Sequence, residues 1–121
     1  MAVVSLNKFR TIRAGISTEM VGIYTCPIGV ASIVTLALVT NVSTASSVRS
    51  VTAVHHREDL ENPSLQTDYR IAFEALIPPN DSLNLVADGR LVLETNDIIK
   101  VQSDADGDLE IILSVLENAK Q

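Results

Sequence analysis

The sequence is short of aromatic residues, glycine and cysteine, and each shortage excludes a class of functional site. It has no tryptophan, two tyrosines and two phenylalanines, too few for the stacking platforms that bind nucleic-acid bases or sugars. Its five glycines form no phosphate-binding loop and no Gly-x-Gly-x-x-Gly motif. Cys26 is the only cysteine, so no disulfide can form within the chain. Its apolar surroundings indicate a buried, unreactive thiol.

Positive charge is also scarce. Nine lysines and arginines stand against fifteen aspartates and glutamates, which gives a formal net charge of -6. An acidic surface repels phosphate backbones, and no cluster of basic residues offsets that repulsion. The charge balance therefore predicts a protein without a nucleic-acid partner.

The longest apolar run covers residues 28–42 and is interrupted by Ser32, Thr35 and Thr40. It is too short to cross a bilayer as a helix, which needs about 20 apolar residues. The first ten residues do not have the basic and apolar regions of a signal peptide. We therefore expect a soluble protein without a membrane partner, and a buried strand over the apolar run.

The sequence is rich in branched aliphatic residues, and these recur at every second position in several segments. Apolar side chains occupy alternate positions at Leu91 and Leu93, and again at Ile99 and Val101, as in strands with one buried face. Turn-forming residues recur about every 8–12 positions, which is typical of a sandwich or barrel. The pattern predicts an all-β, single-domain antiparallel β-sandwich of about eight core strands, with jelly-roll-like and immunoglobulin-like strand orders both open.

The expected strands follow the apolar periods between the turns. They lie near residues 2–6, 8–14, 19–25, 30–41, 47–56, 67–75, 82–86, 90–93, 97–103 and 108–116. We expect the sandwich domain to span residues 15–121 and residues 1–14 to form an N-terminal arm or an edge strand.

The N-terminal segment carries Lys8, Phe9, Arg10 and Arg13. On an otherwise acidic protein, such a cationic arm could add a strand to a neighbouring subunit and so act in assembly. The alternative is a first strand that folds onto its own sheet.

Residues 55–65 break the strand pattern. This segment is polar, has no clear period and contains Pro63, which excludes a central strand there. It predicts a long exposed loop that begins with His55, His56, Arg57, Glu58 and Asp59. Such a loop either makes a specific contact or is simply solvated.

Two groups of residues contain side chains of the types that bind metal ions. Asp104, Asp106 and Asp108 surround Gly107 and could offer oxygen ligands to Ca²⁺, but the spacing departs from that of an EF-hand and a hairpin turn explains the same residues. His55 and His56 are adjacent, and neighbours on a strand point to opposite faces. We therefore expect no metal and no other cofactor. Serine, histidine and aspartate occur in no recognised catalytic context, so we expect no catalytic residues.

Several short segments with strand-and-turn character resemble a known family. The first half of the likeness comprises Gly15-Ile16, residues 21–27, Gly29 and residues 33–42. The second half comprises residues 76–79, 91–94, 97–103 and 113–117. Together these segments resemble small virion structural proteins of tailed bacteriophages, such as phages of cyanobacteria and other aquatic bacteria.

This resemblance implies a β-sandwich subunit of the virion without enzymatic activity, made in the host cytoplasm. The implied place is a head decoration, neck or tail accessory subunit. The implied partners are other copies of the chain, in a homo-oligomer within a symmetric particle, and other virion proteins. The alternative is a monomeric binding module that presents residues 55–65 to a receptor or ligand.

Overall fold

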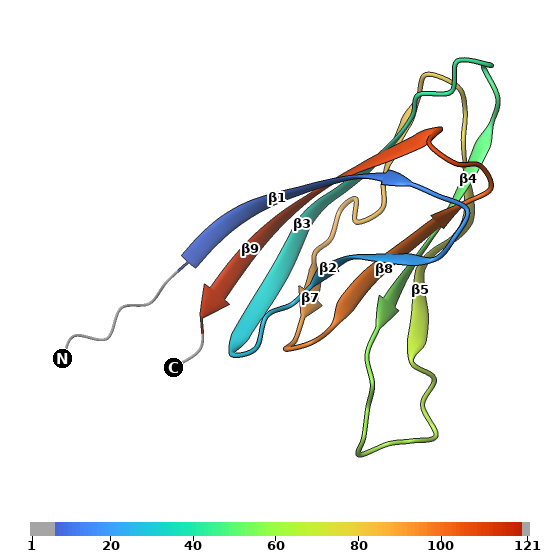
Figure 1. The fold of residues 1–121 in the computed structure, drawn as a ribbon. Helices are drawn as coiled ribbons and strands as arrows, with labels where there is room; N and C mark the ends of the chain where they lie inside the picture. Colours follow the sequence, from blue (N-terminus) through green and yellow to red (C-terminus); the bar gives the residue numbers. More distant parts are fainter. Residues whose placement is uncertain (1–6, 120–121) are drawn as a thin grey trace.

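The computed structural model describes residues 7–119, which form nine strands in two antiparallel sheets (Figure 1). The first sheet contains β1 (Asn7–Ile16), β9 (Leu109–Ala119), β3 (Val30–Asn41), β6 (Ser82–Asn84) and β7 (Leu91–Leu93). The second sheet contains β2 (Val21–Thr25), β8 (Ile98–Ser103), β4 (Arg49–His56) and β5 (Asp68–Ile77). The predicted all-β sandwich is confirmed. The strand expected at residues 2–6 lies outside the described residues.

The strand order identifies the connectivity. The first sheet runs β1-β9-β3-β6, with β7 also paired to β3, and the second runs β2-β8-β4-β5. β6 pairs with residues 38–40 of β3, and β7 pairs with residues 32–34 of β3. β6 and β7 therefore occupy the position of one strand that is interrupted in the middle. The chain thus forms two four-strand layers and crosses repeatedly between them, which is jelly-roll rather than immunoglobulin connectivity.

Asn84 explains why the strand expected at residues 82–86 stops early. Its side-chain Oδ1 accepts hydrogen bonds from the backbone N–H of Ala37 at 3.1 Å and of Val86 at 3.2 Å. The side-chain amide of Asn84 therefore takes the place of a backbone strand partner for the Ala37 N–H. The Leu85 N–H still donates to the Ala37 carbonyl at 2.8 Å, after which the chain forms turns until β7 pairs with β3 again.

The core lies between the two sheets and is almost wholly aliphatic. Leu93, Ile99 and Val101 are buried, and Leu91 packs against them while half-buried. The alternation of apolar residues therefore predicted correctly which side chains of these strands face the core. Both sheets direct every second side chain inward, as a pleated strand requires.

Residues 7–16 form β1, the edge strand of the first sheet. β1 pairs with β9 along its whole length, from Asn7 opposite Asn118 to Ile16 opposite Leu109. Of the two predicted alternatives for this segment, the described part adopts the edge strand. β1, β9 and β3 have 10, 11 and 12 residues and run side by side (Figure 1). No helix that could cross a membrane occurs in residues 7–119.

Candidate functional site

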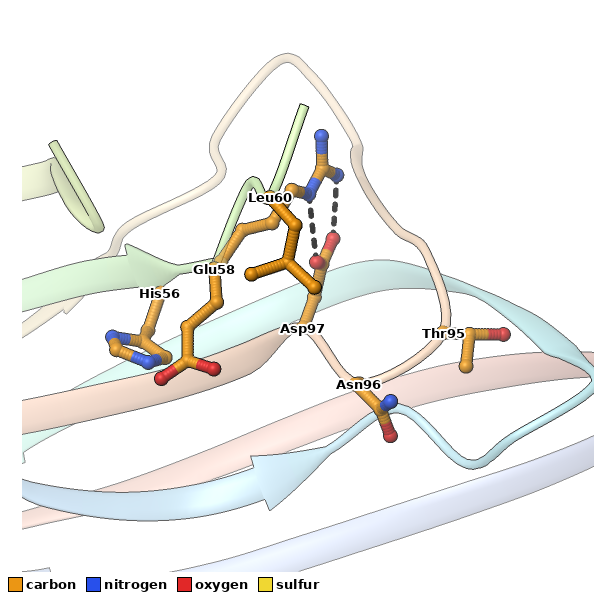
Figure 2. A pocket seen from close by; sticks show the side chains of 7 residues that line it. His56, Glu58, Leu60, Thr95, Asn96 and Asp97 are labelled. Atoms are coloured by element: carbon orange, nitrogen blue, oxygen red, sulfur yellow. Dashed lines mark hydrogen bonds and ion pairs between the residues drawn. The ribbon is translucent and has the colours of Figure 1, made fainter. Parts of the chain in front are cut away.

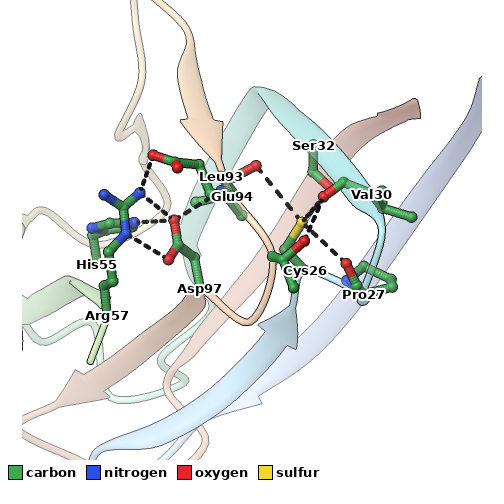
Figure 3. Close-up of polar contacts among 10 residues, drawn as sticks. Cys26, Pro27, Val30, Ser32, His55, Arg57, Leu93, Glu94 and Asp97 are labelled. Atoms are coloured by element: carbon green, nitrogen blue, oxygen red, sulfur yellow. Dashed lines mark hydrogen bonds and ion pairs between the residues drawn. The ribbon is translucent and has the colours of Figure 1, made fainter. Parts of the chain in front are cut away.

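The richest cluster of charged side chains surrounds Asp97, at the end of the sandwich where β4 leads into the β4–β5 loop. Asp97 closes the turn between β7 and β8, and its side chain is 1% exposed. Its carboxylate accepts hydrogen bonds from Arg57 Nε at 2.7 Å, Arg57 Nη2 at 2.6 Å and the Glu94 backbone N–H at 2.8 Å. His55 Nε2 lies 2.8 Å from the same carboxylate (Figure 3).

The turn that carries Asp97 is held in place by the segment after β2. The backbone N–H of Cys26 donates to the Asp97 carbonyl, and the N–H of Asn96 donates to the Cys26 carbonyl, both at 2.8 Å. Asn96 adopts a left-handed conformation with φ of 70°, which asparagine tolerates better than most residues. The Thr95-Asn96-Asp97 corner expected from the sequence is therefore a turn, and it fixes the direction of the Asp97 carboxylate.

Electrostatics favours the ionised form of this cluster. Burial alone raises the pKa of the Asp97 carboxyl, but the hydrogen bonds from Arg57, the Glu94 N–H and His55 outweigh burial and lower the pKa to about 2. The hydrogen bonds that Arg57 donates to Asp97 also raise the pKa of Arg57 above its ordinary value. Arg57 also pairs with Glu94 at 2.9 Å. The buried charge of Asp97 is thus matched by one cation.

The structure corrects the exposed loop expected at residues 55–65. His55 and His56 are the last residues of β4, paired with β5 and β8, and both are half-buried, as is Arg57. His56 Nδ1 lies 2.6 Å from Asp68 Oδ1, so the two histidines face different carboxylates. These polar residues continue the strand because each has an acidic partner. The connection proper is residues 57–67, in which Glu58 is exposed and Asp59 half-buried.

An open pocket of about 230 Å³ lies beneath this connection (Figure 2). Its lining consists of His56, Arg57, Glu58, Leu60, Thr95, Asn96 and Asp97. The only guanidinium in the lining is already shared by two carboxylates, and the imidazole is held by Asp68. The arrangement therefore stabilises the base of the loop, and it leaves Leu60, which is 90% exposed, to face solvent.

The three carboxylates of the β8–β9 hairpin do not converge. Asp104 accepts from the Ser50 N–H at 3.1 Å, Asp106 accepts from the Thr18 N–H at 2.8 Å, and Asp108 pairs with Arg49 at 2.7 Å. Gly107 adopts a φ of 75° at the turn. Each aspartate thus fastens a different neighbouring segment. Within residues 7–119 no three acidic, histidine or cysteine side chains form a group that could hold a metal ion.

A second buried polar cluster lies between the sheets and was not predicted. The Tyr24 hydroxyl donates to Glu117 Oε2 at 2.5 Å and lies 2.8 Å from Ser32 Oγ. Burial, reinforced by the hydrogen bond to Glu117, raises the pKa of Tyr24 to about 12. The signal in the sequence was the period of β9, which places Glu117 inward two residues after Val115.

Cys26 lies beside this second cluster and is buried, as predicted. Its thiol lies 3.3 Å from Ser32 Oγ and 3.2 Å from the Val30 carbonyl (Figure 3). A thiol enclosed by such neighbours is shielded from reagents. Its expected lack of reactivity remains a prediction.

The four residues of the expected assembly arm all lie on β1 and divide between its two faces. Arg10 points inward and pairs with Glu117 at 3.5 Å, and Lys8 lies on the same side by register. Phe9 and Arg13 point outward and are exposed. The arm is therefore a strand whose outward side chains remain free for contacts.

Comparison with known proteins gives a likeness of fold. No family model matches the sequence, and no curated protein matches it. A chain in a solved structure described as "Bacillus endospore appendages form a novel family of disulfide-linked pili" superposes with a TM-score of 0.55 at 10% sequence identity. The match covers 97% of this chain and 89% of that chain. At this identity the likeness concerns the fold alone.

Proposed function

We propose that the chain is a non-enzymatic structural subunit of a tailed-phage virion that acts through contacts with other copies and with other virion proteins. The observation that carries the proposal is the contrast between the polar and the apolar surface. Charged side chains such as Asp97, Asp104, Asp106 and Asp108 are engaged in contacts within the chain, whereas large apolar side chains such as Phe9 stand exposed.

This contrast favours association over catalysis. A catalytic site needs a positioned nucleophile, acid or base with free access to a substrate. The buried Tyr24 hydroxyl instead donates to the Glu117 carboxylate, and the buried Cys26 thiol lies against Ser32 Oγ. Exposed apolar patches are typical of surfaces that bind other proteins.

The likeness to a pilus protein supports a role in assembly. The related structure is described as a disulfide-linked pilus, so a chain of this fold serves there as the unit of a larger structure. The present chain has one cysteine, and it is buried. We therefore propose that its copies associate without covalent links. The virion setting itself rests on the resemblance of its strand-and-turn segments to phage structural proteins.

Light scattering coupled to size-exclusion chromatography tests self-association. The expected result is a defined oligomer whose mass is a whole-number multiple of the 13.0 kDa of one chain. A monomer at every concentration would contradict self-association. The virion setting is tested separately by mass spectrometry of purified tailed-phage particles from the source of the gene. The chain should be present at a fixed ratio to the major capsid protein, and its absence from such particles would overturn the phage assignment alone.

A monomeric binding module is a second candidate, favoured by the pocket of about 230 Å³ and the exposed Leu60 beside it. On that alternative the protein stays monomeric, and substitution of Leu60 by serine abolishes binding to a receptor fraction without changing the unfolding temperature.

A further inference from the structure

The outer face of the first sheet carries a continuous apolar row. Phe9 of β1 lies opposite Leu116 of β9, and Leu116 lies opposite Ile33 of β3. Ile33 in turn lies opposite Val92 of β7, so the row crosses the full width of the sheet. All four positions alternate with inward residues, which directs their side chains away from the second sheet. Phe9 is 83% and Val92 is 56% exposed.

A second apolar pair extends the patch along the strands. Ile112 of β9 lies opposite Leu38 of β3, on the same outer face, and Ile112 is 39% exposed. Leu36 lies between the two rows, where β3 has a bulge. We refer to these seven residues as the outer apolar patch: Phe9, Ile33, Leu36, Leu38, Val92, Ile112 and Leu116.

Charge on this face is balanced, unlike charge on the whole protein. By register, the outward positions of the described strands of the first sheet include two charged residues, Arg13 and Glu110. They carry opposite signs, whereas the chain has a net charge of -6. Two copies that meet through this face therefore do not bring net like charge together, although the whole chain is acidic.

The dimensions of the face suit a stable pair. β9 has eleven residues, and a rise of about 3.4 Å per residue with four strands about 4.8 Å apart gives a face of about 700 Å². Two such faces bury about 1,400 Å², within the usual range for a specific interface. Asn7, Asn118, Thr40 and Ser82 lie at the two ends of this face and supply the polar rim that interfaces have.

We infer that the outer face of the first sheet is the surface through which two copies of this chain pack face to face, with the outer apolar patch at the centre. The inference rests on the proposed function, because it names the contact by which the subunit would self-associate. Sheets pack in this way at about 10 Å separation, with side chains interdigitated. Arg13 and Glu110 are diagonal neighbours at one corner of this face, so each copy brings a pair of opposite charges to the contact.

Substitutions within the patch give the first test. Phe9→Ser and Val92→Lys place polar groups at the two ends of the apolar row, and each should raise the dissociation constant by roughly tenfold or more, as loss of an apolar anchor does. Leu60→Lys and Leu76→Lys are matched controls, since both residues are highly exposed elsewhere. Sedimentation velocity over a concentration series measures association, and thermal unfolding verifies that each variant is folded.

Charge exchange gives a second test that depends on the same face being used by both copies. Arg13→Glu makes the face doubly negative and Glu110→Arg makes it doubly positive, so each variant alone should associate at least tenfold more weakly than the wild type. An equimolar mixture should recover association. Arg70→Glu and Glu58→Arg, which are exposed on the second sheet and the loop, change the net charge equally and should have no effect.

The outcomes separate this inference from the proposed function. Weaker association of the patch variants, with recovery in the mixture, supports both. If oligomers persist in all patch and charge variants, the outer face of the first sheet is not the contact surface, but the proposal of a self-associating subunit stands. A wild-type protein that is monomeric at every concentration overturns both the face and the proposed self-association, and the virion setting is then decided by mass spectrometry of the particles.

Discussion

Arg57 and Asp97, forty positions apart, form a forked pair in which the guanidinium donates two hydrogen bonds to one buried carboxylate. The pair joins the first residue of the β4–β5 loop to the turn between β7 and β8. The Arg57 backbone N–H also donates to the Thr67 carbonyl at 2.9 Å, which closes the loop at its base. One residue thus anchors the loop through both its side chain and its main chain.

Replacing Arg57 by alanine should destabilise the fold by about 2 kcal/mol, because the Asp97 carboxylate loses its cation while it stays buried. Arg57→Lys should recover only part of the loss, since an ammonium group cannot form both hydrogen bonds in the same plane. Urea unfolding monitored by circular dichroism measures the change. Arg90→Ala, an exposed residue of the β6–β7 segment, is the control and should alter stability by less than about 0.5 kcal/mol. Equal effects of the two alanine variants would show that the pair contributes nothing.

Asp97 should make stability depend on acid pH. Its pKa is about 2 in the folded protein and 3.8 in the reference state, so the folded state prefers the ionised form. The stabilisation, about 2 kcal/mol, is therefore complete above pH 4 and is lost as the pH falls through 2. Asp97→Asn removes this component, and the difference in unfolding free energy between wild type and variant should shrink between pH 4 and pH 2. Asp88→Asn, at an exposed turn, should leave the profile unchanged, and parallel profiles for Asp97→Asn would contradict the prediction.

Removing the hydroxyl of Tyr24 should lower the free energy of unfolding, because the second buried cluster loses two hydrogen bonds. Tyr24→Phe leaves Glu117 and Ser32 each without one hydrogen-bond partner, at an expected cost of about 1–2 kcal/mol. Because the pKa of Tyr24 is raised from 10.0 to about 12, its stabilising contribution is present below pH 10 and is lost as the pH rises through 12. Chemical unfolding at pH 7 and at pH 11 tests both statements. Tyr69→Phe, at a half-exposed position of β5, provides the control.

The phase of β7 gives a sharp contrast between two adjacent residues. Leu93 is fully buried, so Leu93→Asp places an unpaired charge in the core and should abolish cooperative folding. Val92 is 56% exposed on the opposite face, so Val92→Asp should remain folded and unfold cooperatively. Circular dichroism and thermal unfolding of the two variants suffice. A folded Leu93→Asp protein would mean that the strand has the opposite phase.

The strands were predictable from the sequence because their signal is local. Residues 30–41 were expected as a strand and form β3, and the strand expected at 97–103 begins one residue later. The strand expected at 108–116 continues to Ala119, because Glu117 is buried through its contact with Tyr24, a partner 93 positions away. The periodicity of a sequence contains no record of such a partner.

The strand order and the candidate site were not predictable for the same reason. Local alternation does not say that β9 lies between β1 and β3, so the jelly-roll order could not be distinguished from an immunoglobulin order. Asp97 was recognised as a turn residue, but the contact that gives it a structural role comes from Arg57 on another segment. His55 and His56 fall both at the end of the strand expected at residues 47–56 and at the start of the expected loop, and the contacts with Asp97 and Asp68 that let them end the strand are not visible in the sequence.

Because the chain has a single cysteine, labelling of its thiol can report local opening of the fold. Cys26 lies where the end of β2 meets the turn that carries Asp97, and no other thiol in the sequence competes for a reagent. The rate at which a thiol-specific dye labels the native protein therefore measures how often this one corner of the sandwich separates from its neighbours. Compared between the free subunit and the assembly proposed above, that rate would measure whether assembly reduces motion at the end of the fold that carries the loop.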